Sequence, residues 1–265
     1  MKDVNYLKEN GVDVDYALSL LGDMETYNSI MSDYIDAYNE RLNKIKDYKE
    51  KSDMNNYSIE VHSLKSDSKY LGLNTLAEIS LKHEMASKEG KVEEVNNSFD
   101  ELLKEADRAI NICRTYLGKS SEESIKVEKK EEIDLTNTIK PVILVADDSP
   151  IIRNFVTDIF KDNYEVKDAS TGREVADIIS KNLDKIAILL LDLNMPDIDG
   201  FQVLEWFNQN NLFEKIPVSI ITGANDKSSI DRAFKYPIVD MINKPFERED
   251  IKNIVTKTLN QRNII

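Results

Sequence analysis

The sequence predicts two domains of different class, an all-α four-helix bundle followed by a doubly wound α/β domain with a five-stranded parallel sheet. In residues 1–118 the apolar residues keep a helical i, i+3, i+4 spacing, and no stretch is typical of a strand. From Pro141 onward, short β-branched runs alternate with amphipathic stretches of about a dozen residues. A chain of 265 residues is long enough for two domains that each bury a core.

Composition and charge exclude several classes of protein. Aspartate and glutamate number 49 against 35 lysines and arginines, and a net charge of −14 should repel nucleic acid and anionic membranes. The single cysteine, Cys113, excludes an intrachain disulfide. No apolar run reaches the roughly 20 residues of a membrane span or resembles a signal peptide. We therefore expect a cytosolic protein that binds no nucleic acid and does not insert into membranes.

One short and four long helices are expected in residues 1–118. Asp13 or Asp15 is a candidate N-cap for the short helix, which ends near Leu21. Apolar stripes mark the long helices at residues 27–45, 57–71, 76–86 and 99–117. Gly72 is a plausible C-cap for the second of them. Because the connections are short, the four long helices should pack as an antiparallel, up-and-down bundle.

Residues 119–140 separate the two patterns. They contain no aromatic residue, Gly or Pro, but six acidic residues and five lysines. This composition fits either a solvated linker or a frayed helical extension, and both remain open. As a flexible coil, the segment would hold its ends about 25 Å apart, so the two domains could meet face to face.

The strands and helices of the predicted α/β domain follow in residues 141–265. The expected strands are 142–146, 164–169, 186–191, 216–222 and 239–243. Helices should start near Ser149, Arg173, Gly200, Asp226 and Glu247. Ser149 is a good N-cap because Pro150 occupies the first helical position.

Polar residues follow four of the predicted strands at their carboxyl ends. Asp147 and Asp148 follow the first strand and Asp192 the third, while Thr222 ends the fourth and Lys244 follows the fifth. These ends meet in one crevice of a parallel sheet. Three carboxylates there repel one another unless a cation lies among them, and hard oxygen ligands select Mg²⁺. A hydroxyl and an ammonium beside that metal would complement the oxygens of a phosphoryl group.

Residues 141–262 resemble the receiver domains of two-component response regulators, which have a flavodoxin-like fold. The resemblance rests on four matching elements: Asp147-Asp148, the Leu-Asp-Leu-Asn-Met-Pro-Asp-Ile-Asp-Gly segment at 191–200, Thr222-Gly223 and Lys244-Pro245-Phe246. The intervals also agree, since Asp192 lies 44 residues after Asp148, 30 before Thr222 and 52 before Lys244.

This resemblance implies roles for the crevice residues. The implied Mg²⁺ ligands are Asp147, Asp148, Asp192 and the main-chain carbonyl of Asn194. Asp192 would accept the phosphoryl group, Thr222 and Lys244 would sense the acyl phosphate, and the Lys244-Pro245 bond would be cis. Such a domain promotes its own phosphorylation and dephosphorylation, so we expect a signalling phosphoprotein rather than an enzyme.

Two departures from the receiver pattern affect the expected readout. Met241 stands three residues before the lysine, where receivers usually have Tyr or Phe. The small residues that commonly precede that aromatic are replaced by the segment Tyr236-Pro237-Ile238. We expect the phosphorylation chemistry to survive and the conformational readout to be weaker or different.

His62 is the candidate acceptor in the helical region. It follows Val61, so the 100° step per residue turns it off the apolar stripe. Lys65, Ser66 and Lys69 come three, four and seven residues later and should share its solvent-exposed face. An exposed imidazole beside ammonium groups is a reasonable nucleophile toward phosphate, with the lysines stabilising the transferred charge. A metal site is not expected, because no cysteine or second histidine shares this face.

Residues 5–118 resemble histidine phosphotransfer (HPt) domains through the segment 61–72. The His-x-Leu-Lys core of that family is present from His62 to Lys65, and Leu-Gly closes the motif at Gly72. Ser66 stands where the family usually has Gly and could narrow access to Nε2 of His62. Asp67 should turn about 140° away from His62 and matter less.

Three other residues receive structural interpretations. His83 occupies a stripe position of its helix and should be a packed or hydrogen-bonded core histidine. Cys113 lies on the apolar stripe of the last long helix and should be inert. Trp206 is expected to be half-buried packing.

The sequence therefore predicts a phosphorelay protein of a two-component regulatory system. A phosphoryl group would pass between His62 and Asp192 of this chain, or between each of them and matching sites on partner proteins. Because the sequence has no ATP-binding Gly-rich segment, the expected partners are a histidine kinase or hybrid kinase and a downstream receiver or effector. Two alternatives stay open: a non-catalytic two-domain adaptor with vestigial phosphorylation, and an Mg²⁺-dependent phosphatase with an aspartate nucleophile.

Overall fold

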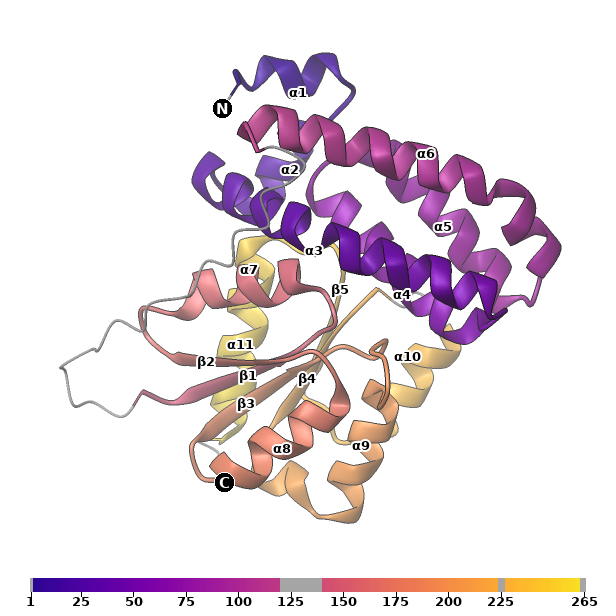
Figure 1. Ribbon diagram of the computed structural model, residues 1–265. Helices are drawn as coiled ribbons and strands as arrows, with labels where there is room; N and C mark the ends of the chain where they lie inside the picture. The colour runs from indigo at the N-terminus through magenta and orange to yellow at the C-terminus, as the bar shows by residue number, and fades with distance from the viewer. Residues whose placement is uncertain (1, 120–139, 224–226, 263–265) are drawn as a thin grey trace.

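The computed structural model describes residues 2–119, 140–223 and 227–262. In these ranges an N-terminal region made of helices lies over a C-terminal α/β region (Figure 1). The expected linker, except for its end residues 119 and 140, and the helix start expected at Asp226 lie outside the described residues.

The N-terminal region has its helices where the apolar stripes predict them. Their bounds are α1 Asn5–Glu9, α2 Val14–Leu21, α3 Met24–Glu50, α4 Met54–Tyr70, α5 Asn74–Lys88 and α6 Val92–Leu117. Helix α1 is an addition to the predicted set. Both α3 and α5 contact α4 and α6. These contacts are consistent with the expected four-helix bundle, and the bundle stays a prediction.

Capping residues explain where these helices begin and end. The side chain of Asp13 accepts a hydrogen bond from Tyr16 N at the start of α2, as predicted. Gly72 lies just beyond α4 with a φ of +73°, and a Cβ there would meet the main-chain oxygen of Asp13 at 2.3 Å. Glycine is therefore required where α4 ends against the start of α2.

The C-terminal region is a doubly wound, flavodoxin-like α/β domain, as predicted. Its elements are β1 Val142–Ala146, α7 Pro150–Phe160, β2 Glu165–Ala169, α8 Gly172–Asn182, β3 Ile186–Leu191, α9 Gly200–Gln209, the 3₁₀ turn η1 Leu212–Glu214, β4 Val218–Thr222, α10 Lys227–Ala233, β5 Asp240–Asn243 and α11 Arg248–Arg262. The strands pair in parallel in the order β2-β1-β3-β4-β5. The strand order reverses between β1 and β3, which places a ligand crevice at their carboxyl ends.

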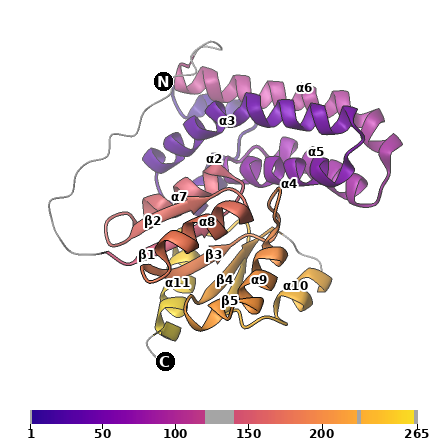
Figure 2. The same cartoon turned by 60° about the horizontal axis from the view of Figure 1, so that its bottom comes forward.

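The two faces of the sheet belong to different cores. Along β1, Leu144 and Ala146 belong to the core that includes residues of α8 and α9. Ile143 and Val145 point to the other face and belong to the core that includes residues of α7 and α11. This second core continues without a break into the helical region, because α3 packs on α7 (Figure 2). The apolar core is therefore not divided at the predicted domain boundaries, 118 and 141, and these boundaries stay a prediction.

The residues given structural interpretations lie as expected. His83 is buried, and its Nδ1 lies 2.7 Å from the hydroxyl of Tyr57. Cys113 is buried on α6, and Trp206 is partly buried on α9. Among the described helices, none combines the length and the apolarity that crossing a bilayer requires.

Cys113 should be almost unreactive in the folded protein. Burial raises the pKa of its thiol to about 12, whereas alkylation requires the thiolate. At pH 8, iodoacetamide should therefore modify Cys113 at least about 1,000-fold more slowly in the native chain than in guanidinium, measured by mass spectrometry. Native and denatured rates within tenfold of each other would contradict the core position of this thiol.

Candidate functional site

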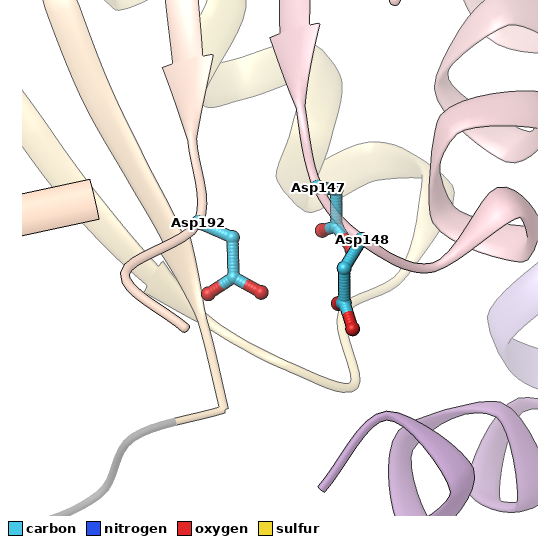
Figure 3. Close-up of side chains that lie close together, drawn as sticks. All are labelled: Asp147, Asp148 and Asp192. Carbon is cyan, nitrogen blue, oxygen red and sulfur yellow. The ribbon is translucent and has the colours of Figure 1, made fainter. Parts of the chain in front are cut away.

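Three carboxylates meet where β1 and β3 end (Figure 3). Asp147 and Asp148 follow β1 directly, and Asp192 follows β3, the strand paired with it. One ligand oxygen from each residue lies within 4.8 Å of the other two. Asp147 and Asp192 are buried, and Asp148 is partly exposed. The sequence correctly predicted that these side chains converge.

A buried lysine enters the same cluster from β5. The Lys244 ammonium lies 2.5 Å from Asp192 Oδ2 and 2.6 Å from Asp147 Oδ2, and the Lys244-Pro245 bond is cis, as predicted. Burial lowers the pKa of Lys244, but the two carboxylates outweigh it and hold this pKa above its ordinary value. Burial also raises the pKa of Asp147, against the opposing effect of Lys244.

Main-chain hydrogen bonds fix the remaining residues of the crevice. Lys244 N donates to the carbonyl of Thr222 at 2.8 Å, so the ends of β4 and β5 stay together. Asn194 N donates to Asp192 Oδ1 at 3.1 Å in the loop after β3. The carboxylates of the cluster offer oxygen atoms as metal ligands, and these atoms lie close enough together to surround one small ion. These residues fit a hard divalent cation such as Mg²⁺.

Helix α4 brings His62 to this crevice from the helical region. Gly223 directly follows Thr222, and a Cβ built on Gly223 would lie only 2.6 Å from Nε2 of His62. His62 is 2% exposed, so the predicted solvent-exposed face is wrong. The reason is that this face of α4 packs against the C-terminal domain, which an amphipathic pattern within α4 cannot reveal.

The two ring nitrogens of His62 have different surroundings. Nδ1 lies 2.7 Å from Oε1 of Glu84, which comes from α5. A carboxylate only accepts hydrogen bonds, so Nδ1 carries the hydrogen and the neutral ring keeps its lone pair on Nε2. Nε2 is buried and has no hydrogen-bond partner among the described residues. The ring is therefore held with its nucleophilic nitrogen toward the crevice.

Glu84 is a site residue that the sequence analysis missed. Its Oε2 lies 2.7 Å from the ammonium of Lys65, and Lys88 lies 2.6 Å from its Oε1. Burial opposes ionisation, but His62 and Lys65 outweigh it and hold the pKa of Glu84 well below its usual range. Lys65 is thus buried and paired with Glu84 instead of lying on an exposed face. No local spacing connects Glu84 with His62; only the packing of α4 on α5 does.

Asp67 makes contacts that the sequence analysis did not expect. Asp67 is buried, and its Oδ1 accepts a hydrogen bond of 2.5 Å from the hydroxyl of Ser149, the N-cap of α7. Its Oδ2 lies 3.3 Å from the guanidinium of Arg41 on α3. Although Asp67 turns away from His62, it turns toward a second contact with the C-terminal domain.

Comparisons with known proteins match the C-terminal region of the chain. The family model of the response regulator receiver domain matches residues 143–256. A chemotaxis protein CheY homolog of Campylobacter jejuni is 31% identical over 114 residues, which cover 42% of this chain and 85% of that protein. Hybrid signal transduction histidine kinase D of Dictyostelium discoideum is 26% identical over 112 residues, 42% of this chain and 7% of the kinase. The crystal structure of a response regulator receiver domain protein from Clostridium thermocellum is 25% identical, covers 47% of this chain and 98% of that one, and gives a TM-score of 0.43.

Glu84→Gln should destabilise the protein by about 3 kcal/mol at pH 7, because the buried Lys65 ammonium loses its carboxylate. The folded-state pKa of Glu84 is below the ordinary 4.5, so its contribution to stability is complete above that pH and is lost as the pH falls toward the lowered value. The difference between wild type and variant should therefore shrink below about pH 4.5. Urea unfolding between pH 7 and pH 3.5 measures it.

Glu78→Gln is the matched control, since Glu78 is exposed on the same helix. It should change the free energy of unfolding by less than about 0.5 kcal/mol. Equal effects of the two substitutions at pH 7 would show that Glu84 makes no special contribution.

Proposed function

Because the chain belongs, through residues 143–256, to the response regulator receiver family, we propose that it is a phosphorelay protein that transfers a phosphoryl group between Asp192 and His62. In this proposal the helical region is a histidine phosphotransfer domain. One observation carries it: the buried, unbonded Nε2 of His62 lies against Gly223, at the rim of the carboxylate cluster, among the described residues. A histidine with no chemical role would not need its free ring nitrogen held at this position.

We assign each residue of the crevice a role in this transfer. Asp192 accepts the phosphoryl group, and the hydroxyl of Thr222 and the ammonium of Lys244 bind its oxygens. When bound by Asp147, Asp148, Asp192 and the carbonyl of Asn194, Mg²⁺ would neutralise negative charge on the phosphoryl oxygens. The ammonium of Lys244 lies 2.5 Å from Asp192, which supports its role in binding the phosphoryl oxygens at this acceptor.

Transfer from Asp192 to His62 balances with the groups present. The lone pair of Nε2 attacks phosphorus as the P–O bond to Asp192 breaks, and the electron pair of that bond returns to the Asp192 carboxylate. Lys244 stabilises this carboxylate. The ring of His62 gains positive charge, which the adjacent Glu84 carboxylate offsets at Nδ1. The reverse reaction uses the same contacts in the opposite order.

Outside partners complete the relay. Receiver domains interact with histidine kinases and with downstream effectors, and we propose a histidine kinase or hybrid kinase as the source of the phosphoryl group. A second receiver or an effector would then take it from His62 or respond to phosphorylated Asp192. The proposal places the protein between these partners as a carrier.

The full chain should carry two chemically distinct phosphoryl groups. After incubation with radiolabelled acetyl phosphate and Mg²⁺, the wild type should hold base-labile label on Asp192 and base-stable label on His62. His62→Gln should keep only the base-labile label, and Asp192→Asn should lose both labels, because His62 would receive its group from Asp192. Acid and base treatment followed by gel autoradiography measures each fraction.

His83→Gln provides the matched control, because His83 is the chain's other histidine and is hydrogen-bonded inside the helical region. This variant should keep both labels. Base-stable label that persists in His62→Gln would contradict the assignment of His62, and unchanged label in Asp192→Asn would contradict that of Asp192. A wild type with base-labile label alone would leave a receiver without transfer to the helices and would favour the adaptor interpretation.

Asp148→Ala should weaken Mg²⁺ binding by more than about tenfold, because the cluster loses one carboxylate ligand. Isothermal titration calorimetry of the full chain with MgCl₂ measures the change. The control Asp162→Ala removes an exposed aspartate after α7 and should leave the affinity unchanged. Equal affinities of wild type and Asp148→Ala would move the metal site away from this cluster.

A further inference from the structure

Both proposed phosphoacceptors are buried, and α4 contacts the receiver at the same crevice. His62 is 2% exposed and Asp192 is fully buried. Lys244, on the receiver side, is also buried. Within the part of the chain that the structure describes, neither acceptor side chain is exposed enough for an outside histidine or aspartate to reach it.

Hydrogen bonds at two residues that follow His62 hold α4 against the receiver. One residue after His62, the hydroxyl of Ser63 donates to Oδ2 of Asp148. Five residues after His62, Asp67 accepts from Ser149 and also faces Arg41. Because these contacts come from successive turns of one helix, they fix its position along the receiver as well as its distance.

An aromatic anchor closes the C-terminal end of α4. Tyr70 is fully buried, with its ring centroid 6.0 Å from that of Phe155 on α7 and 5.8 Å from that of Phe246. The hydroxyl of Tyr70 accepts a hydrogen bond of 3.0 Å from Phe246 N. Phe246 also stacks on Phe155 at 6.1 Å. Buried aromatic residues of this kind dominate the free energy of an interface.

Helix α3 adds polar contacts at the edge of the same interface. Asp33 accepts a 2.7 Å hydrogen bond from the side-chain amide of Asn154 on α7. Thr26 accepts a 3.4 Å hydrogen bond from Arg248 of α11. The contact thus has an apolar centre and a polar rim, as stable protein interfaces do.

We propose that α4 is a built-in cover that shields both acceptors from outside partners, and that Tyr70 is the residue that latches it. The inference rests on the proposed function only for what the cover regulates. The receiver surface beneath it, formed by Gly223, Phe155 and Phe246, fits a helix that presents a histidine. A kinase domain with such a helix would have to compete with α4 of the same chain for this surface.

The cover lowers the apparent affinity of any such partner by the fraction of open molecules. If one molecule in about 100 is open, the apparent affinity falls about 100-fold. Any change that weakens the latch then increases partner access in proportion to the open fraction. The position of α4 would therefore control the rate at which outside partners exchange phosphoryl groups with this chain.

Chemical modification of His62 in the full chain tests the cover without any phosphoryl donor. Diethyl pyrocarbonate modifies exposed imidazole nitrogens, and peptide mass spectrometry separates His62 from His83, which reports unfolding of the helical region. In the wild type, His62 should react at least about tenfold more slowly than in the denatured chain. Gly223→Ala should accelerate modification of His62 at least about tenfold, because its Cβ would lie 2.6 Å from Nε2.

Tyr70→Phe removes only the latch hydroxyl and should accelerate modification of His62 about threefold. Tyr236→Phe removes a hydroxyl that bonds Glu205 at 3.0 Å within the receiver, and this matched control should react like the wild type. A wild-type His62 that reacts as fast as the denatured chain, while His83 stays protected, would overturn the proposal. Unchanged rates in both Gly223→Ala and Tyr70→Phe would overturn it too.

If Gly223→Ala also exposes His83, the Tyr70→Phe variant alone decides. Faster modification of His62 without His83 then supports the cover, and equal rates overturn it. A chain that protects His62 but carries no phosphoryl group would contradict the proposed function while leaving the cover intact.

Discussion

The burial of negative charge is the constraint on which the candidate site depends. Asp147 and Asp192 are removed from water at the end of the sheet, and such a pair stays ionised only beside a cation. Lys244 supplies that cation from β5, two strands away from Asp192. The register of β4 with β5 and the hydrogen bond from Lys244 to Thr222 hold the ammonium in place. The order of the strands therefore determines which charges can meet.

The helical region orients the imidazole of His62 and compensates the buried charge beside it. A buried imidazole is a nucleophile only if one nitrogen keeps a lone pair, and Glu84 determines which one by accepting from Nδ1 of His62. Glu84 is itself a buried charge, and Lys65 and Lys88 compensate it. A short network from two helices thus orients His62 toward the receiver. Its carboxylate also lies where the ring would gain charge during phosphoryl transfer.

Local patterns predicted what depends on neighbours in the chain. Runs of β-branched residues ending in Asp147, Asp192 and Lys244 located the strands and the crevice, because strand ends in a parallel sheet must meet. The same reasoning placed His62 off the apolar stripe of α4 but could not show that the receiver covers this face. Glu84 and the contact of Asp67 with Ser149 were missed for the same reason. Most residues of α4 after its first turn are buried, since the helix packs on its own region and on the receiver.

The contact between Ser66 and Gly223 shows how the two regions fit each other. Ser66 stands where the histidine phosphotransfer domain proposed for this region would usually have glycine, and it adds a side chain beside His62. A Cβ on Gly223 would lie 3.7 Å from Oγ of Ser66 and 2.6 Å from Nε2 of His62. Because Gly223 has no side chain, the space beside it accommodates the ring of His62 even though Ser66 carries a side chain on the same face of α4. His62 can approach the crevice only because residue 223 is glycine. Neither the motif around His62 nor the receiver motif reveals this fit by itself, because it depends on how the two surfaces pack together.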